Sequence, residues 1–230
     1  MKFTCQAKEI KERIQNLARI SLKTGLDPIF ECIYIESDGH NLTIRSANTE
    51  VIAEQNTPIK GEINGSCLVN AALLSKVLSN ISKSSDVITF ERVDNVLKIQ
   101  NLNNYTEIDL YNETMFPKIQ NGGDKILSIN KGVFVDLLRS VSFCAATTEI
   151  KPEIASIYIY TKDDQIYSVA TDSYRLAEKH VYFEEDTQIN LLIPQKNINQ
   201  ILSILESEEE DNLDLIKNED VLILETKTSF

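Results

Sequence analysis

The sequence predicts an α+β fold in which antiparallel strands carry helices on one face. Two observations support this prediction. Short segments with apolar residues at helical spacing are followed by runs in which apolar and polar residues alternate. The same order of segments then recurs in the second half of the 230-residue chain, so we expect the same unit to be built twice.

In the first half, a helix is expected over 8–20, where Ile10, Ile14 and Leu17 form one apolar face. A second helix is expected over 71–82. Strands are expected around Phe3 and over 29–37, 41–54, 61–69, 87–93, 95–101 and 105–112.

The second half repeats this plan. A helix is expected over 132–143, with Phe134, Leu138 and Val141 facing inward, and another over 197–206. Strands are expected over 125–130, 154–161, 165–172, 173–181 and 189–194, and as a pair within 212–227 that turns at 218–220.

Landmarks in the two halves match at a nearly constant spacing. Leu78 corresponds to Leu202 at a shift of 124 residues, and Ala47 to Ala170 at a shift of 123. Because solenoids repeat every 20–50 residues, this long period indicates a duplicated domain. We therefore expect one domain at 1–122 and a second at 123–230.

The second domain is expected to end one strand short. After Tyr105 the first unit has a full strand and a closing turn at Phe116-Pro117, whereas the matching point in the second unit is Phe230. A missing strand leaves a sheet edge unpaired. The chain is thus expected to be part of something longer; the alternative is a degenerate domain that manages without the strand.

Composition limits the possible functions. The net charge is −12 and the pI about 4.7, which argues against indiscriminate binding to nucleic acid or membranes but permits a local basic surface. The N-terminus has no hydrophobic signal core and no apolar run could span a membrane, so we expect a cytoplasmic protein. The four cysteines form no Cys-x-x-Cys and are expected to be buried thiols; no cofactor or metal is predicted.

The run ATDSYRLAEKH, 170–180, holds the densest set of reactive side chains. Asp172, Ser173, Tyr174 and His180 could be imagined as a hydrolase site. Nucleophilic catalysis needs a base oriented by a third group, and no nucleophile motif surrounds either histidine. No phosphate-binding loop or nucleophile elbow is present, so we expect that the protein is not an enzyme.

Five motifs in order resemble the bacterial DNA polymerase III β subunit family, the sliding clamps. They are MKFT at the start, LDPI at 26–29, Phe116-Pro117, SVSFCAATTE at 140–149 and VATDSYRLA at 169–177. The family's usual form of the last motif is A-T-D-G-H-R-L-A. The resemblance spans the whole chain.

The resemblance implies the DNA-clamp fold and a non-catalytic role in DNA replication. Two three-domain subunits of this family close head to tail into a ring around duplex DNA, with sheets outside and helices lining the hole. The ring is a processivity factor that tethers the polymerase. This chain would supply the first domain and most of the second, and the third domain would be absent from it. Such a piece could not close the usual homodimeric ring.

The resemblance also implies a weakly basic helix lining that contacts phosphates without reading bases. The alternative is that these cations lie on ordinary solvated helix faces. Thr24 and Ala72 stand where family members often carry basic residues, so contact is expected to be shifted or weaker. The expected DNA-facing residues are Lys8, Lys11, Arg19, Lys23, Lys76, Lys83, Lys131, Arg139 and Lys196.

A pocket for short linear peptides of the polymerase, the clamp loader and repair proteins is implied at the last motif. Apolar walls would take hydrophobic anchors, and Arg175 would stack on or hydrogen-bond the peptide, unless it forms a salt bridge with Asp172. Because Ser173 replaces a glycine, we expect a backbone that does not need positive φ. The matching pocket residues are Ile154, Thr171, Ser173, Tyr174, Arg175 and Leu176.

A subunit interface is implied at Val77, Ile81, Thr106 and Ile108. Ile81 could equally be a core residue, and Thr106 is polar where the family is usually apolar. A regulatory clamp paralogue, complete at about this length and binding proteins without encircling DNA, remains the alternative function.

Overall fold

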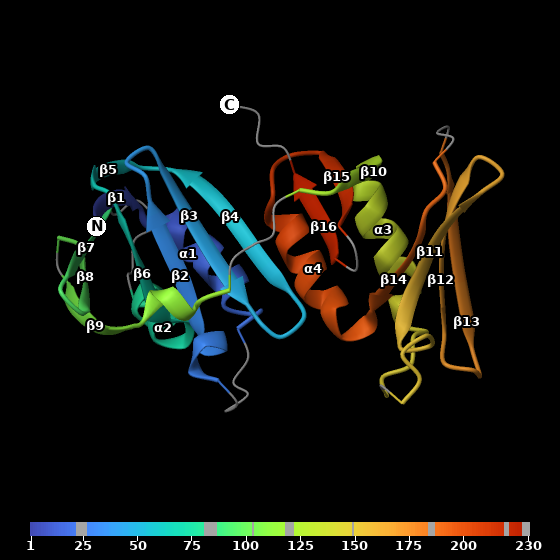
Figure 1. Cartoon of the computed structure of the whole chain (residues 1–230), viewed down its shortest axis with the longest axis horizontal. Coiled ribbons are helices and arrows are strands. Elements are labelled where there is room, and N and C mark those ends of the chain that lie inside the picture. The colour runs from blue at the N-terminus through green and yellow to red at the C-terminus, as the bar shows by residue number, and fades with distance from the viewer. Residues whose placement is uncertain are drawn as a thin grey trace. The chain divides into compact units, whose positions relative to one another are not determined.

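The protein is described from a computed structural model (Figure 1), which describes residues 1–21, 27–80, 87–102, 104–117, 122–148, 150–183, 187–218 and 221–226. Five residues named above, Lys23, Thr24, Ile81, Lys83 and Phe230, lie outside these ranges. The chain divides into two compact units, Met1–Ile119 (unit 1) and Gln120–Phe230 (unit 2). Each unit combines antiparallel strands with two helices, so the predicted α+β class is confirmed.

Unit 1 contains two copies of a βαβββ pattern, with one short extra strand and two 3₁₀ turns. Its elements are β1 (Lys2–Gln6), α1 (Ala7–Leu17), η1 (Pro28–Glu31), β2 (Cys32–Ser37), β3 (Asn41–Ala47), β4 (Ile52–Pro58), β5 (Lys60–Ile63), β6 (Gly65–Asn70), α2 (Ala71–Ser79), β7 (Val87–Val93), β8 (Val96–Gln100), β9 (Tyr105–Tyr111) and η2 (Glu113–Met115).

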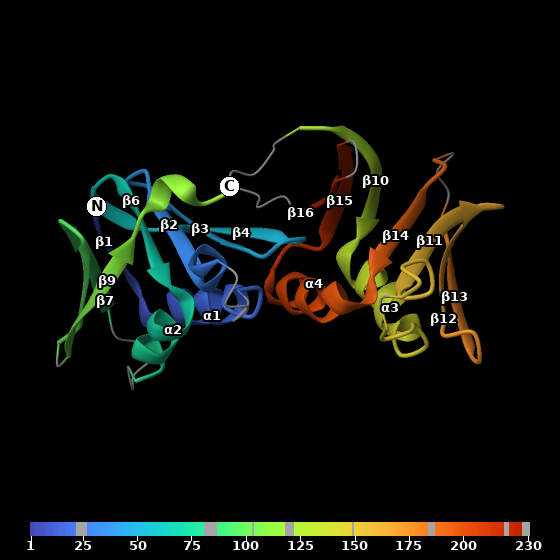
Figure 2. The ribbon, with the colours of Figure 1, turned by 60° about the horizontal axis from the view of Figure 1, so that its bottom comes forward.

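One continuous sheet runs through unit 1, in the order β4-β3-β2-β6-β9-β8-β7-β1-β5. Strand β9 joins its two halves, because its first five residues pair with β8 while Leu110 and Tyr111 pair with β6. The apolar stripe predicted for α1 is buried, with Ile10, Ile14 and Leu17 inside. Helices α1 and α2 lie side by side (Figure 2), and Gln15 donates a hydrogen bond to Ser79.

Unit 2 follows the same order with two strands fewer among the described residues, since β5 and β9 have no counterpart there. Its elements are β10 (Asp124–Asn130), α3 (Lys131–Ser142), β11 (Ser156–Lys162), β12 (Gln165–Thr171), β13 (Leu176–Tyr182), β14 (Asn190–Pro194), α4 (Gln195–Ser207), β15 (Asn212–Asn218) and β16 (Val221–Thr226).

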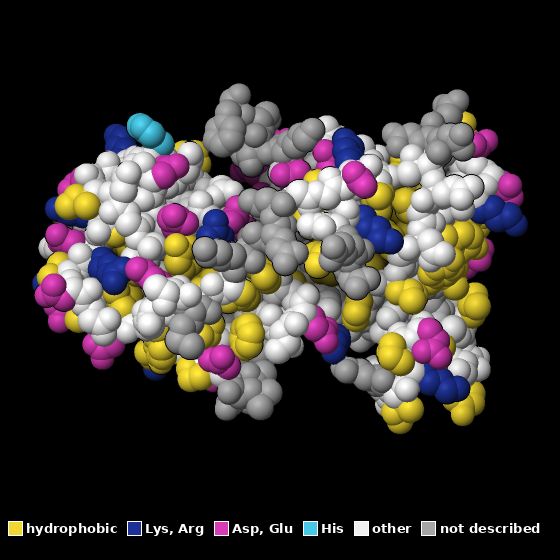
Figure 3. Space-filling view, in the orientation of Figure 1, with side chains coloured by type: hydrophobic (Ala, Val, Ile, Leu, Met, Phe, Trp, Pro, Cys, Tyr) yellow, Lys and Arg dark blue, Asp and Glu magenta, His cyan; other side chains and the backbone are white. Residues whose placement is uncertain are grey.

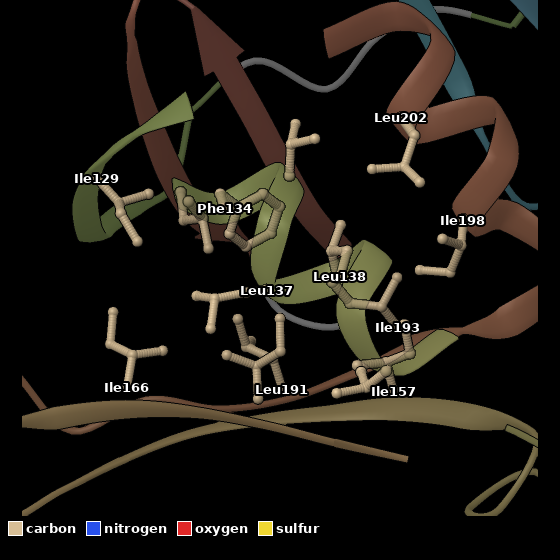
Figure 4. Close-up of a cluster of buried hydrophobic side chains, with 14 of the residues drawn as sticks. Ile129, Phe134, Leu137, Leu138, Ile157, Ile166, Leu191, Ile193, Ile198 and Leu202 are labelled. Atoms are coloured by element: carbon tan, nitrogen blue, oxygen red, sulfur yellow. The ribbon is translucent and has the colours of Figure 1, made fainter. Parts of the chain in front are cut away.

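The strands of unit 2 form two separate sheets, β10-β15-β16 and β13-β12-β11-β14. Its core lies between these sheets and the helices α3 and α4 (Figure 4). Phe134, Leu138 and Val141, the predicted inward face of α3, are all buried there. Asn130 caps α3, since its side chain accepts a hydrogen bond from the Val133 N–H.

The registers of β2, β3, β4 and β6 against those of β11 to β14 give a shift of 124 residues between the two units, and those of β7 and β8 against β15 and β16 give 125. Tyr34 pairs with Arg45 in unit 1, and Tyr158 pairs with Val169 in unit 2. The counterpart of Ala170 is therefore Ser46, and the shift of 123 that we read from Ala47 was wrong by one residue. The error arose because a local match of alanines does not fix which face of a strand a residue occupies.

Most predicted elements are present, with differences at turns. The run 41–54 is a hairpin of β3 and β4, and the run 61–69 is divided into β5 and β6. The strand expected over 173–181 begins only at Leu176, because the residues before it form a turn. The four cysteines are free; Cys5 is half-buried and the other three are buried, as expected. Burial raises the pKa of Cys67 to about 12.

Candidate functional site

The predicted pocket residues gather at one end of unit 2. The β12–β13 turn is there, because it connects Thr171 to its strand partner Leu176. The loop between α3 and β11, which contains Ile154, reaches the same end, since β11 and β12 are antiparallel neighbours (Figure 1). The structure therefore brings together two segments that are about 20 residues apart in sequence.

Hydrogen bonds within the β12–β13 turn define its shape. The Asp172 Oδ1 accepts from the backbone N–H groups of Tyr174 (3.0 Å) and Arg175 (2.8 Å). The Thr171 hydroxyl donates to the Arg175 carbonyl (2.6 Å) and accepts from the Ser173 N–H (3.1 Å). This is an Asx-turn, which Asp favours because its short side chain mimics a backbone carbonyl.

The conformation of Ser173 contradicts our expectation. Its φ is +75°, in the left-handed region, although the residue is not glycine. This φ accompanies the hydrogen bonds of the Thr171 hydroxyl, which accepts from the Ser173 N–H and donates to the Arg175 carbonyl. The position therefore does favour glycine, and serine adopts the same backbone at a cost of about 1 kcal/mol.

Arg175 forms the salt bridge that we had considered as the alternative to a peptide contact. Its Nε and a terminal nitrogen donate to the Asp172 Oδ2 at 3.0 and 2.9 Å. The same terminal nitrogen donates to the carbonyl of Phe143 at the C-terminal end of α3 (3.3 Å). The guanidinium thus ties the turn to the helix, while the side chain stays 60% exposed and can still meet a ligand.

Electrostatics keep the Asp172 carboxyl ionised. The backbone N–H groups of Arg175 and Tyr174, followed by the Arg175 side chain, lower its pKa to about 2. The turn is therefore negatively charged at Asp172 and positively charged at Arg175 throughout the physiological pH range.

Exposed apolar side chains surround this turn. Tyr174 is 96% exposed and Leu176 is also exposed, whereas Ile154 is half-buried. Phe143 and Ile150, which we did not predict as site residues, are exposed in the neighbouring loop. Phe143 is the last residue of the helix expected over 132–143, whereas Ile150 is a large apolar residue in a segment without helical or strand periodicity. The five together give this end an apolar surface around one Asp–Arg pair.

Unit 1 contains the same turn, with Glu50 in the position of Tyr174 and Val51 in that of Arg175. Asn48 corresponds to Asp172, and its Oδ1 accepts from the N–H groups of Glu50 and Val51 at 2.8 and 2.7 Å. The Asn48 side chain also donates to the carbonyl of Ile20, just after α1. The tie between turn and helix is thus made by Asn48 in unit 1 and by Arg175 in unit 2.

The predicted DNA-facing cations lie on helices, but several already have protein partners. Arg139 forms an ion pair with Glu206 of α4, and the Lys131 ammonium donates to the Glu208 carbonyl. Lys8 and Lys76 are exposed, and Lys11 is half-buried. Arg19, on the turn after α1, and Lys196, on α4, are exposed.

The same helices also carry acidic residues. Glu9 and Glu12 are exposed on α1, beside Lys8, and Asp136 is exposed on α3. Asp136 pairs with Lys179 of β13 at 3.0 Å, and this lysine holds the Asp136 pKa below its usual value. The described helices therefore present mixed charge with only a small basic excess.

Among the predicted interface residues, Ile108 packs in the interior of unit 1 and is only 6% exposed. Val77 on α2 and Thr106 on β9 are half-buried. The edge of β9 over Tyr105–Asp109 that faces away from β8 has no strand partner among the described residues. An unpaired edge of this kind can pair with another chain.

The hydrolase arrangement is not assembled. His180 lies on β13 beside the Tyr167 ring (5.4 Å between centroids), four residues along the strand from Leu176, or about 13 Å from the turn that holds Ser173. In the described part of the chain, no three His, Cys, Asp or Glu side chains are placed to hold a metal ion. No helix described by the structure is long and apolar enough to cross a membrane.

Comparison with known proteins identifies the family. Residues 1–119 match the N-terminal domain of the DNA polymerase III beta subunit, and residues 128–229 match its central domain. The beta sliding clamp of Buchnera aphidicola subsp. Rhopalosiphum padi is 24% identical over 221 residues, which cover 90% of this chain and 57% of that protein. The beta sliding clamp of Bacillus subtilis (strain 168) is 23% identical over 245 residues, covering 100% and 62%.

Solved structures share the fold. The sliding clamp of Pseudomonas aeruginosa bound to griselimycin superposes with a TM-score of 0.90 at 18% identity, covering 98% of this chain and 62% of that one. The clamp of Bacillus subtilis gives 0.89 at 20% identity, with the same coverage. The chain thus spans about three-fifths of the length of these relatives. It belongs to the DNA polymerase III beta subunit family, the beta sliding clamps, which are non-catalytic processivity subunits.

Proposed function

We propose that this chain acts as part of a sliding clamp that encircles duplex DNA in the cytoplasm, on the nucleoid, and tethers the replicative polymerase. The observation that carries this proposal is the match of both units, in order, to the first two domains of the beta subunit. The helices supply a small basic excess, with Lys8 and Lys76 exposed. Such a lining would hold phosphates without reading sequence, so contact would weaken as salt rises.

Topology provides the test of encirclement. The protein is loaded onto nicked circular plasmid and onto the same plasmid linearised, and retention is measured by gel filtration. A clamp stays on the circle and slides off the ends of the linear form. Equal retention on both forms would favour the second function, a clamp-related protein that binds other proteins without encircling DNA. The chain spans three-fifths of its relatives' length. The experiment therefore tests most directly whether a homodimeric ring closes, with Val77, Thr106 and the open edge of β9 at the interface.

We further propose that the turn at 172–175 and its apolar surroundings bind short linear peptides of the polymerase, the clamp loader and repair proteins. Leu176, Tyr174 and Ile154 would contact hydrophobic anchors, and the exposed side of Arg175 would contact the peptide backbone or a carboxylate. Because Asp172 already binds Arg175, this cation is held in place before the peptide arrives.

A double variant tests this pocket. Arg175→Ala with Leu176→Ala should weaken binding of a labelled peptide from the polymerase's clamp-binding motif by about tenfold or more, measured by fluorescence anisotropy. The matched control replaces Lys217 and Val221, an exposed cation and an exposed apolar residue on β15 and β16, and should leave affinity unchanged. Unchanged affinity in the first variant would remove Arg175 and Leu176 from the site.

A further inference from the structure

One face of the four-stranded sheet of unit 2 is rich in aromatic side chains. The rings of Tyr158 and Tyr160 stack at 5.0 Å, those of Tyr160 and Tyr167 at 4.9 Å, and His180 lies against Tyr167. Figure 3 shows hydrophobic side chains gathered over β11 and β12. We define the tyrosine face as Tyr158, Tyr160, Tyr167, Val169, Glu178 and His180, which the strand registers place on one side of the sheet.

The matching face of unit 1 is built around an arginine. Arg45 forms ion pairs with Glu54 (2.5 Å) and Glu36 (3.5 Å), and its guanidinium carbon lies 5.4 Å from the centre of the Tyr34 ring. Thr43 donates a hydrogen bond to Asn56 beside this group. The face is therefore closed by interactions within the chain, and the arginine stacks on an aromatic ring while a carboxylate neutralises it.

The tyrosine face keeps two parts of this arrangement and lacks the third. At the shift of 124 residues that relates these strands, Tyr158 corresponds to Tyr34 and Glu178 to Glu54. Val169 takes the place of Arg45, opposite Glu178 in the strand register. No described residue forms an ion pair with Glu178. Unit 2 thus has the ring and the carboxylate that hold an arginine in unit 1, but not the arginine.

The neighbouring position is also less covered than in unit 1. There, Phe116 stacks on Tyr34 at 5.5 Å and helps to bury Leu68 completely. The counterpart of Leu68 is Leu192, which pairs with Tyr158 on β14 and is 54% exposed. Tyrosine rings that are stacked but half-exposed, next to an exposed leucine, offer a preformed apolar surface that loses little side-chain entropy when it is covered.

Charge distinguishes the partner that fits. Residues 120–230 contain 20 Asp and Glu against 10 Lys and Arg, a net charge of −10, whereas residues 1–119 contain 15 against 13, a net charge of −2. A basic segment is therefore favoured over an acidic one at the tyrosine face, where Glu178 has no ion-pair partner among the described residues. The pKa of the Tyr160 hydroxyl is raised mainly by burial, and the nearby Glu178 carboxylate is the second cause.

We propose that the tyrosine face binds an arginine-bearing segment of a partner protein, whose guanidinium occupies the position over Tyr158 and beside Glu178 that Arg45 occupies in unit 1. This surface is a second interaction site, separate from the 172–175 turn, and it requires neither ring closure nor DNA.

A pair of synthetic peptides tests the proposal. One carries Arg between two Phe residues, flanked by Gly and Ser, and the other carries citrulline in place of Arg, which keeps the shape without the charge. Because the chain has eight tyrosines and no tryptophan, binding can be followed by tyrosine fluorescence on the intact chain. The Arg peptide should bind about two- to fivefold tighter than the citrulline peptide, the contribution of one exposed ion pair and ring contact.

Two variants locate the site. Glu178→Gln should remove the preference, so that the Arg peptide and the citrulline peptide bind with about equal affinity. Val169→Arg should fill the site from within the chain, as Arg45 does, and lower the affinity for the Arg peptide by about tenfold without lowering the thermal midpoint. The peptide that binds the 172–175 turn should bind Val169→Arg as it binds the original chain.

Three results would overturn the proposal. Equal binding of the two peptides would remove the role of the guanidinium. Unchanged preference in both variants would place the binding elsewhere. Tighter binding of a single-stranded thymidine oligonucleotide, abolished by Tyr160→Ala, would make the face a base-stacking surface instead.

Discussion

The two units share one plan, yet unit 1 has a single nine-stranded sheet and unit 2 has separate sheets of three and four strands. The difference comes from β9, which pairs with β8 on one side and with β6 at its end. The corresponding strands of unit 2, β16 and β14, each have an edge without a partner among the described residues. The comparison shows what such a strand contributes, because Leu97 and Ile99 of β8 are buried while Leu222 and Leu224 of β16 are only partly buried.

The strongest test of this comparison replaces matched leucines. Leu97→Ala should cost unit 1 about 3 kcal/mol of unfolding free energy, because the side chain is fully buried. Leu222→Ala should cost unit 2 about 1 kcal/mol of unfolding free energy, because the Leu222 side chain is only partly buried and water already reaches it. Hydrogen exchange of peptides from β8 and β16, measured separately in urea, gives the two losses. Equal losses would show that β9 does not determine the burial of the neighbouring strand.

The turns at 48–51 and 172–175 differ in one backbone angle. Ser173→Gly should raise the stability of unit 2 by about 1 kcal/mol, because glycine adopts a φ of +75° without strain. Thr49 is the matched position in unit 1 and is not among the residues with positive φ, so Thr49→Gly should bring no gain. Urea denaturation of both variants measures the change in the free energy of unfolding. A gain at Thr49, or none at Ser173, would contradict the strain that we assign to the turn.

The ion-paired face of unit 1 is expected to contribute less to the free energy of unfolding than the changes above. Arg45→Ala should cost about 0.5–1 kcal/mol, since partly exposed ion pairs are screened by water and salt. Arg45→Lys should recover only part of this, because an ammonium does not stack on Tyr34 as a guanidinium does. The measurement is the urea midpoint of unit 1 at low and high salt. A loss that does not change with salt would show that Arg45 acts through packing instead.

The smallest effect is a local response to acid that only unit 2 should show. The pKa of Asp172 is about 2, below the ordinary value near 4, so the folded turn favours the ionised carboxylate. Its contribution is therefore complete above about pH 4 and is lost as the pH falls toward 2. Asn48 does not titrate, so the unit 1 turn should not respond. Amide NMR shifts of Tyr174 and Val51, whose N–H groups donate to Asp172 and Asn48, compare the two turns between pH 5 and pH 2.

Asp172→Asn is the control for this titration. The amide oxygen can still accept the two backbone hydrogen bonds, but it carries no charge, so the acid response of Tyr174 should disappear. A response that persists in this variant would belong to another carboxyl group. In that case the assignment of the lowered pKa to Asp172 would be wrong.

The sequence by itself was sufficient for the duplication, the α+β class and the positions of the helices. These features depend on local periodicity, which a chain displays wherever it is half-buried. The motif at 169–177 did not locate the turn, because strands were expected over 165–172 and 173–181, whereas β13 begins at Leu176. Nor did it reveal that Ser173 has a positive φ, an angle that accompanies the hydrogen bond from its N–H to the Thr171 hydroxyl.

Only the tertiary structure decided which side chains are available for function. Arg139 and Glu206 are 67 residues apart in sequence and meet because α3 packs beside α4. Ile108 is buried because β9 pairs with β8, and Tyr160 is stacked with Tyr167 because β11 and β12 are in register. Pairings of this kind depend on how distant segments pack, and periodicity along the chain carries no record of them.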